Sequence, residues 1–335
     1  MNRILYIPFL SFLIFTLSCT SPSEPEPVPK GEELLSALER CSEAEDWSQM
    51  LHLLRQSGEI TNQIFMNYAN MALAHRGVLA DSCFCYSPMG PGALIIGNAQ
   101  TRAAYLVQSD VYYTLGFIAA SQRCAFEAMT VAATLDPDVA CLKRLVKTNL
   151  IFGHYRVARK YIEVLSACPG QAEWADHYRS MLNDEAVEHD KELGGKRRGL
   201  SKGEDRFSMF YGWEPELRDI IRSNPSDRTA VEYLGLSYLL QKDMERFGRF
   251  LDEYYDTEAL PAGTLPISFQ QGVIALYQQH REVWPKYQLS DAVVHSYTEY
   301  RDAYFRCQSL PRTQQAGRLY RKFHDTFWFY LMFIE

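Results

Sequence analysis

The sequence predicts an all-α protein, folded as an α-solenoid of stacked helical hairpins. Apolar residues recur at helical spacing from Leu34 onwards, and each apolar stripe ends at a glycine or a short polar break. No segment of comparable length shows the alternation of apolar and polar residues that predicts a β-strand. The stripes also come in pairs joined by short turns, and paired helices that repeat along a chain are typical of solenoids.

Residues 1–18 are predicted to be a signal peptide. Ile4 to Leu17 form a mostly apolar stretch of 14 residues, whereas a helix that spans a bilayer needs about 20. The small residue Ser18 precedes Cys19, as in bacterial lipoproteins, although Thr16 occupies the position where those proteins prefer leucine. The sequence therefore predicts lipid attachment at Cys19, and an ordinary signal peptide is the alternative.

A proline-rich tether is predicted to follow, over residues 19–31. Four prolines lie between Thr20 and Pro29. Because proline fixes φ and removes a backbone donor, this segment should be extended rather than part of a core. Glu24 and Glu26 are a weak version of the acidic signal that directs lipoproteins to the outer membrane. We expect a protein of the cell envelope that is anchored to a membrane by its lipid. The outer membrane is the favoured one.

Two arrays of helical hairpins are predicted, over residues 32–183 and 207–335. Residues 184–206 separate them. This segment is strongly charged and contains several glycines, so it is expected to be a solvated connection that includes the basic run 196–198. Residues 86–97 are rich in proline and glycine and are expected to form a loop that crosses between hairpins.

Three hairpins resemble the tetratricopeptide pattern, in which a Leu-Gly pair and an aromatic residue on one helix face small and large residues on the next. The best match is Tyr233–Tyr238, because the small residue Gly235 would let two helix backbones approach closely. The second helix of this match carries Phe247, Leu251 and Tyr254. The first of two weaker matches is Tyr112–Gly116, followed by Ala125 and Ala128 on the next helix. The second has Leu145 and Val146 on one helix and Ala158, Ile162 and Leu165 on the next.

Further residues resemble an uncharacterised family of tetratricopeptide-like lipoproteins from the Bacteroidota. The resemblance is concentrated in Asn70–Gly77, Leu79–Asp81, Phe84–Tyr86, Gly90–Gly92 and the aromatic finish Asp325–Tyr330. It implies a helical, exported and membrane-tethered protein. It implies no activity and supplies no catalytic residue.

Composition narrows the classes of function. The net charge is −7, with 34 basic and 41 acidic side chains. Because affinity for nucleic acid is dominated by neutralisation of phosphates, no nucleic-acid partner is expected. Seven cysteines besides Cys19 have no regular spacing. We expect mostly buried thiols, with one disulfide bridge at most.

No catalytic or metal-binding motif lies in a suitable context. Gly199–Gly203 has the G-x-S-x-G pattern of a serine hydrolase, but the charged residues before it cannot form the buried strand that this motif requires. Cys83 and Cys85 lack a second pair of ligands for zinc. We therefore expect no cofactor, no metal and no enzyme activity.

Binding is the function that the sequence favours, because stacked helical hairpins expose a concave groove to extended partners. We expect a scaffold for a protein partner in the envelope, and the alternative is a lipoprotein that captures a glycan or a peptide. In that alternative, exposed aromatic side chains would stack on sugar rings or on peptide side chains. The simpler interpretation is that these aromatic residues pack in the core. The candidates are Tyr211, Trp213, Tyr254, Tyr255 and Trp284. The last apolar run, Phe327–Ile334, is expected to be a buried terminal helix, with a docking surface for a membrane partner as the alternative.

Overall fold

The computed structural model describes residues 29–334 except for 59, 133–135 and 201–211. Within these ranges the protein is all α-helical, as predicted, and the only β-type pairing is an isolated bridge between Tyr255 and Leu260. The predicted signal peptide, the lipid-attachment residue Cys19, most of the tether and the binding candidate Tyr211 lie outside the described residues.

The helices follow one another with short connections. Those of the first part are α1 (Glu32–Glu43), α2 (Trp47–Gln56), α3 (Gln63–His75), α4 (Leu79–Ser82), α5 (Arg102–Leu115), α6 (Ile118–Ala132), α7 (Val139–Ile151), α8 (Tyr155–Ser166), α9 (Ala172–Arg179), α10 (Asp184–His189) and α11 (Lys191–Arg198). Those of the second part are α13 (Glu214–Ser223), α14 (Arg228–Leu240), α15 (Met244–Tyr254), α16 (Ile267–Leu276), α17 (Asp291–Cys307), α18 (Arg312–Phe323) and α19 (Phe327–Phe333). Three 3₁₀ turns, Cys83–Tyr86, Pro91–Ala93 and Arg281–Tyr287, complete the described elements.

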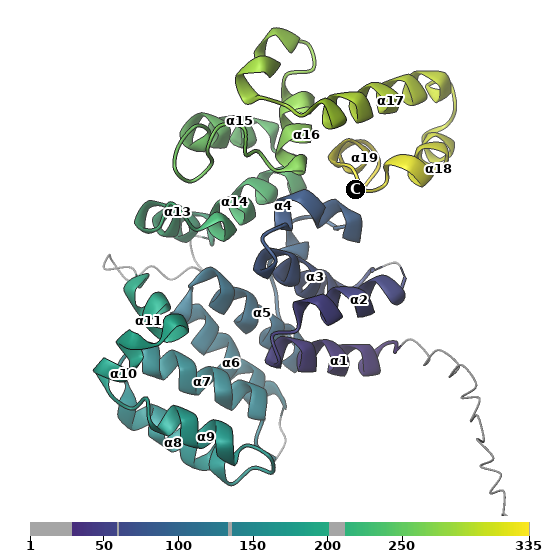
Figure 1. Ribbon diagram of the computed structural model, residues 1–335. Coiled ribbons are helices and arrows are strands. Elements are labelled where there is room, and N and C mark those ends of the chain that lie inside the picture. The colour runs from purple at the N-terminus through teal and green to yellow at the C-terminus, as the bar shows by residue number, and fades with distance from the viewer. Residues whose placement is uncertain (1–28, 59, 133–135, 201–211, 335) are drawn as a thin grey trace, which may run out of the picture.

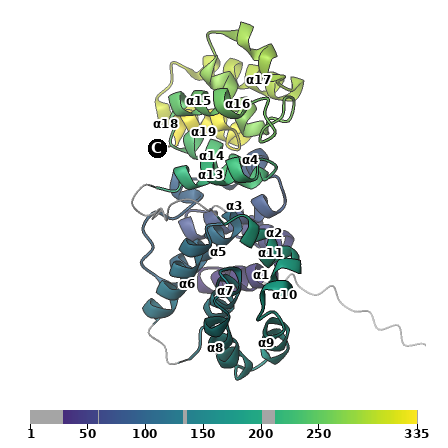
Figure 2. The same ribbon diagram turned by 90° about the vertical axis from the view of Figure 1, so that its left-hand side faces the viewer.

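Successive helices pack on one another through most of the chain. Helices α5 to α9 form a row in which each contacts the next, and α1, α2 and α3 form a second row that joins it through α3 and α5. In Figure 1 the second part, α13–α19, lies above both rows, and Figure 2 shows the molecule as elongated along that direction. This succession of neighbouring hairpins is compatible with the predicted solenoid.

The two Leu-Gly pairs of the tetratricopeptide-like matches serve different purposes. Gly235 lies inside α14, where an added Cβ would come within 2.3 Å of the Phe269 ring and 2.8 Å of the Phe250 ring. Gly116 instead ends α5 with φ of 87°, a left-handed conformation that favours glycine and turns the chain into α6. Only Gly235 therefore has the close-packing role that the pattern predicts.

The predicted charged connection is partly helical. Residues 184–198 form α10 and α11, and α11 packs on α7. Arg197 donates from Nε to the carbonyl of Ile151 at 3.0 Å and from Nη2 to that of Leu150 at 2.6 Å, so it satisfies carbonyls at the C-terminal end of α7. The expectation of a solvated basic loop over residues 196–198 is therefore wrong for Lys196 and Arg197, because carbonyls far away in the sequence bind these two cations, whereas Arg198 is exposed.

The loop over residues 86–97 is part of the core rather than a surface crossing. Leu94, Ile95 and Ile96 are buried. The side-chain amide of Asn67 donates to the carbonyl of Gly92 at 2.8 Å, and that of Asn70 donates to the carbonyl of Ala93 at 2.9 Å. Two buried asparagines of α3 thus supply the hydrogen bonds that the irregular backbone cannot form with itself.

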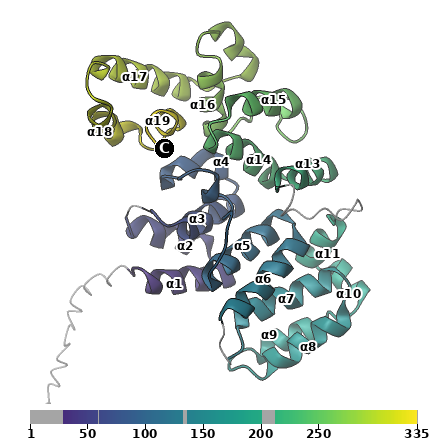
Figure 3. The ribbon, with the colours of Figure 1, turned by 180° about the vertical axis from the view of Figure 1, so that it is seen from behind.

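Helix α4 joins the two parts of the molecule, as Figure 3 shows from behind. It packs against α14 and α16, which follow it by more than a hundred residues. The backbone N–H of Ala80 donates to the buried carboxylate of Glu232 at 3.1 Å, and Asp81 accepts the N–H of Ile267 at the start of α16 at 2.7 Å. Nearby, the Phe84 ring lies 5.3 Å from that of Tyr330. The segments that carry the family resemblance therefore meet at this junction.

The C-terminal run is a buried helix, as expected. Phe327, Trp328, Phe329 and Tyr330 of α19 are all buried. The Tyr330 hydroxyl donates to the carbonyl of Leu240 at 2.6 Å. Of the described helices, none combines the length and the apolar character that a bilayer span requires.

The seven described cysteines are all free thiols, so no disulfide bridge occurs among the described residues. Cys41, Cys83, Cys124, Cys141 and Cys307 are buried, as predicted for most of them, while Cys85 is exposed and Cys168 is half-buried. Burial raises the pKa of Cys124 to about 11, which keeps this thiol protonated and unreactive at neutral pH.

Replacing Gly235 with alanine should destabilise the protein by about 1–3 kcal/mol, because the new methyl group overlaps the rings of Phe250 and Phe269. Chemical denaturation measures this effect. Gly317→Ala is the matched control: Gly317 lies within α18 with nothing near the position of a Cβ, so the substitution should be neutral or stabilising by about 0.5–1 kcal/mol. Equal effects at both positions would contradict a tight contact at Gly235.

Glu232 should make stability depend on pH. Burial raises the pKa of its carboxyl from 4.5 to about 7, against the opposing effects of the Ala80 N–H and Arg228. Because the folded state holds this proton more tightly than the unfolded state, the contribution to stability is complete below pH 4.5 and is lost as pH rises towards 7.

Glu232→Gln keeps an acceptor for Ala80 but does not titrate. We expect the variant to lack this part of the pH dependence and to gain about 1–3 kcal/mol over the original protein above pH 7. Unfolding free energies measured from pH 5 to 8 check this. Glu258→Gln, at an exposed position, is the control and should change neither quantity. Parallel pH profiles for the original protein and Glu232→Gln would contradict the assignment.

Candidate functional site

A cleft of about 590 Å³ lies between the row of α1–α3 and the row that begins with α5. Residues from α1, α2, α3, α5, α7, α9 and α11 line it, so it depends on the packing of both rows. Its lining is unusually rich in charge. The charged lining residues are Glu39, Arg40, Glu43, Glu45, Asp110, Lys143, Arg144, Lys147, Glu192 and Lys196.

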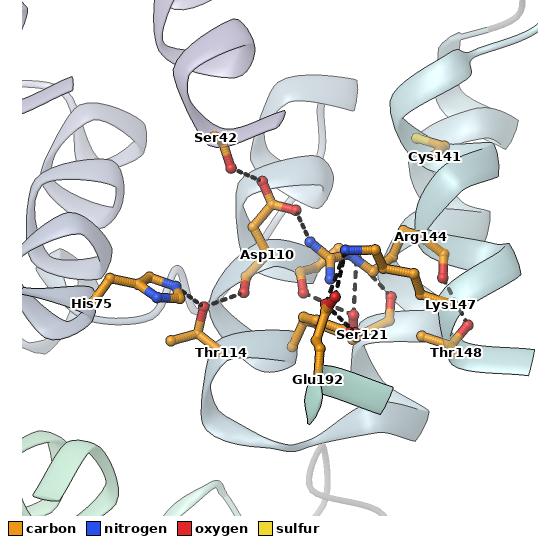
Figure 4. Close-up of polar contacts among 12 residues, drawn as sticks. Ser42, His75, Asp110, Thr114, Ser121, Cys141, Arg144, Lys147, Thr148 and Glu192 are labelled. Atoms are coloured by element: carbon orange, nitrogen blue, oxygen red, sulfur yellow. Dashed lines mark hydrogen bonds and ion pairs between the residues drawn. The ribbon is translucent and has the colours of Figure 1, made fainter. Parts of the chain in front are cut away.

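One wall of the cleft is aromatic. The rings of Trp47 and His75 stack with centroids 4.0 Å apart and planes inclined by 3°. The Nε2 atom of His75 also lies 3.1 Å from the Thr114 hydroxyl (Figure 4). Although His75 keeps contact with solvent, partial desolvation of its ring and repulsion by the nearby cations Lys196 and Arg144 together lower its pKa to about 4. The imidazole is therefore neutral at physiological pH.

Asp110 connects the two rows of helices. Its carboxylate accepts a hydrogen bond from the Ser42 hydroxyl of α1 at 2.8 Å and one from Nη2 of Arg144 on α7, also at 2.8 Å. Figure 4 shows Asp110 between these two partners. An aspartate is rarely so well buried unless it is paired, and its 8% exposure here reflects both contacts.

Tyr113 is surrounded by cations. The guanidinium carbon of Arg144 lies 3.8 Å from the centroid of its ring, and the ammonium group of Lys196 lies 4.4 Å from it. The Tyr113 hydroxyl donates to Glu192 at 2.6 Å, and Lys147 contacts the same carboxylate at 2.9 Å. Burial opposes ionisation of Glu192, but Lys147 and the Tyr113 hydroxyl together hold its pKa below the usual value.

Lys196 differs from the neighbouring cations. Lys143, Arg144 and Lys147 form ion pairs with Glu43, Asp110 and Glu192 respectively. Among the described residues, Lys196 has no carboxylate within ion-pair distance, and its one hydrogen bond is to the backbone carbonyl of Tyr113 at 2.6 Å. Burial, and then repulsion by Arg144, lowers the pKa of Lys196 to about 8, so the group remains mostly charged at neutral pH.

The acidic groups near Tyr113 are already engaged by neighbouring cations. The thiol of Cys141 nearby has a raised pKa because of burial. In the described parts of the chain, no group of three or more His, Cys, Asp or Glu side chains is placed to hold a metal ion. The segment before Gly199 is the helix α11, whereas a nucleophile elbow requires a strand there.

The aromatic residues singled out in the sequence do not form a common platform. Trp213 is half-buried and lines a separate cavity with Arg218 and Arg246, which already pair with Glu253 and Glu214. Tyr255 is half-buried, and its hydroxyl donates to the carbonyl of Lys286.

Two further candidates lie elsewhere. Tyr254 is buried in the core of the second part, so it offers no ring face to a ligand, and its selection as a binding residue is wrong. Trp284 is half-buried and donates from its indole N–H to the carbonyl of Tyr277.

Sequence reasoning missed the residues of the cleft, because each reads as an ordinary polar position on its own helix. One signal was present. Asp110 stands within the largely apolar stretch of α5, and α7 carries Lys143, Arg144 and Lys147 at spacings of one and three residues. An acid on a buried helix together with a basic stripe on a following helix predicts a paired, enclosed polar site.

A helical protein with a mixed-charge cleft is the class that this fold and site define. The chain belongs to the Family of unknown function (DUF6057), whose family model matches residues 3–334. This agrees with the predicted membership of an uncharacterised family. No curated protein and no solved structure matches the chain.

Proposed function

We propose that this chain is a lipoprotein of the cell envelope whose helical hairpins act as a protein-interaction scaffold, and that a segment of the partner protein binds in the cleft between α1–α3 and α5. The observation that carries the proposal is the cleft itself. It combines aromatic surface from Trp47 and Trp174 with charged groups from the four helices α1, α5, α7 and α11.

The anchor rests on the sequence. An apolar segment of 14 residues, a small residue before Cys19 and a proline-rich tether are the parts that a lipoprotein needs. The resemblance to tetratricopeptide-like lipoproteins from the Bacteroidota supports the same proposal, and Glu24 and Glu26 are the weak signal that favours the outer membrane. The predicted tether leads into α1, whose side chains line part of the cleft.

The shape of the cleft supports a protein partner. A volume of about 590 Å³ is in the range of pockets that enclose a small molecule or a few side chains. The cleft lies where two rows of helices meet, and repeat-like helical proteins use such concave surfaces for extended segments. Ser42 and Thr114 on the walls add neutral hydrogen-bonding groups for a peptide backbone.

Capture of a glycan is supported less well. A sugar ring stacks on an exposed, flat aromatic face, but one face of Trp47 is covered by His75 and one face of Trp174 by Tyr178, at 4.1 Å. The lining also contains no asparagine or glutamine, so few neutral planar groups are present to recognise sugar hydroxyls.

Cys19→Ser should abolish lipid attachment. The prediction is that cells expressing the original chain incorporate radioactive palmitate into the protein, whereas the variant remains unlabelled and is recovered in the soluble fraction. Autoradiography and membrane fractionation measure both effects. Labelling that persists in the variant would remove the basis for the anchor.

A photo-crosslinking amino acid placed in the cleft should capture the partner. Ala44 is exposed and lines the cleft without any side-chain hydrogen bond, so it is the position for the crosslinker. Val157, exposed on α8 outside the cleft, is the matched control. After irradiation of intact cells, we expect a crosslinked protein species from position 44 but not from position 157.

Mass spectrometry of that species would identify the partner. Crosslinking that is equal at both positions, or absent at position 44, would contradict a protein-binding cleft. A glycan crosslinked to position 44 would contradict the protein partner and support the alternative, capture of a glycan.

A further inference from the structure

The charges around Tyr113 do not balance. Three cations, Arg144, Lys147 and Lys196, lie within 3.8 to 5.9 Å of the centroid of its ring. Two carboxylates, Asp110 and Glu192, pair with Arg144 and Lys147. One positive charge, that of Lys196, is therefore left in this cluster without a partner carboxylate among the described residues, although the lining of the whole cleft carries five acidic and five basic side chains.

Donors are left over as well as charge. An ammonium group carries three N–H donors, and Lys196 uses one of them for the carbonyl of Tyr113. The Nε and Nη1 atoms of Arg144 have no hydrogen-bond partner, although they are buried. Because donors withdrawn from water without a partner are costly, this cluster is incomplete as it stands.

We propose that the cleft binds a carboxylate group of an acidic segment of the partner protein, with Lys196 as its counter-ion and Arg144 beside it. This inference rests on the proposed protein-binding function and names the chemical group that the site recognises. A carboxylate accepts several hydrogen bonds at once, and pairs between cations and carboxylates are among the stronger protein contacts.

The charge balance favours a carboxylate over a phosphate. A single negative charge matches Lys196, the one cation of the Tyr113 cluster that has no partner carboxylate among the described residues. A phosphate dianion would bring a second charge close to Asp110 and Glu192, which are already in the cluster and would repel it. The aromatic surface of Trp47 and Trp174 lies in the same cleft and would contact the apolar parts of a peptide that carries the acid.

A pair of matched peptides tests the proposal on the intact chain. The probe is an N-acetylated, C-amidated pentapeptide with one central glutamate among alanines, and its control has glutamine in that place. Binding is measured by saturation-transfer NMR and by titration calorimetry. We expect the glutamate peptide to bind about ten-fold more tightly than the glutamine peptide, as one charge-assisted contact implies.

Three variants assign that preference to Lys196. Lys196→Gln keeps a donor for Tyr113 but has no charge, so it should abolish the preference for glutamate. Lys196→Arg keeps the positive charge and should retain most of the preference for the glutamate peptide. Lys160→Gln removes an exposed lysine on the outer face of α8 and should change nothing. If Lys196→Gln fails to fold, the affinities of the two peptides for the original chain and for Lys196→Arg still test whether the cleft prefers a carboxylate.

Three results would overturn the inference: equal binding of the two peptides, an undiminished preference in Lys196→Gln, or displacement of the glutamate peptide by inorganic phosphate at lower concentration than by acetate. Tighter binding of glucuronate than of the peptide would also overturn it, in favour of an acidic sugar. If these tests fail while crosslinking from position 44 persists, the protein-binding function stands and only the carboxylate is wrong. If crosslinking is also lost, both fail.

Discussion

The docking of α4 between the two parts of the molecule is the constraint on which the rest of the structure depends. A helix of four residues has almost no stability of its own, so its position is set by tertiary contacts. Leu79 and Ala80 are buried, and the carboxylate of Glu232 accepts the N–H of Ala80. Helix α3 leads into this junction and α5 leaves it, and these two helices supply His75 and Asp110 to the cleft. The junction that holds the second part in place therefore lies between two helices that line the cleft.

Apolar periodicity predicted the helices well, but it did not predict what each residue contacts. The stripes of α7 with α8 and of α14 with α15 are buried as expected. Gly116 and Gly235 both follow a leucine in similar local sequence, yet one turns the chain and the other lies under two phenylalanine rings. A local pattern does not say which distant side chain approaches it. For the same reason α11 was expected to be a solvated loop, because the carbonyls that Arg197 binds are 46 and 47 residues away.

The cleft was harder to predict than the fold, because its polar residues come from five helices that are far apart in the sequence. Each of these residues resembles the solvated face of an amphipathic helix when it is considered alone. Only contacts between the two rows, such as those of Asp110 with Ser42 and Arg144, bring these polar groups together in one cleft. Of the aromatic residues chosen from the sequence, Tyr254 was misjudged for the opposite reason. Packing of the core uses rings such as Tyr254, so an excess of tyrosine indicates packing before it indicates binding.

The junction at α4 also dictates an order of events during synthesis. Asp81 meets the start of α16 at Ile267, 186 residues further along the chain. Leu79 and Phe84 are therefore made long before the helices that bury them, and they stay in contact with water while those helices emerge. Contacts between such distant segments form slowly, and apolar surface exposed in the meantime promotes aggregation. Burial of this apolar surface therefore has to wait for the C-terminal half of the chain.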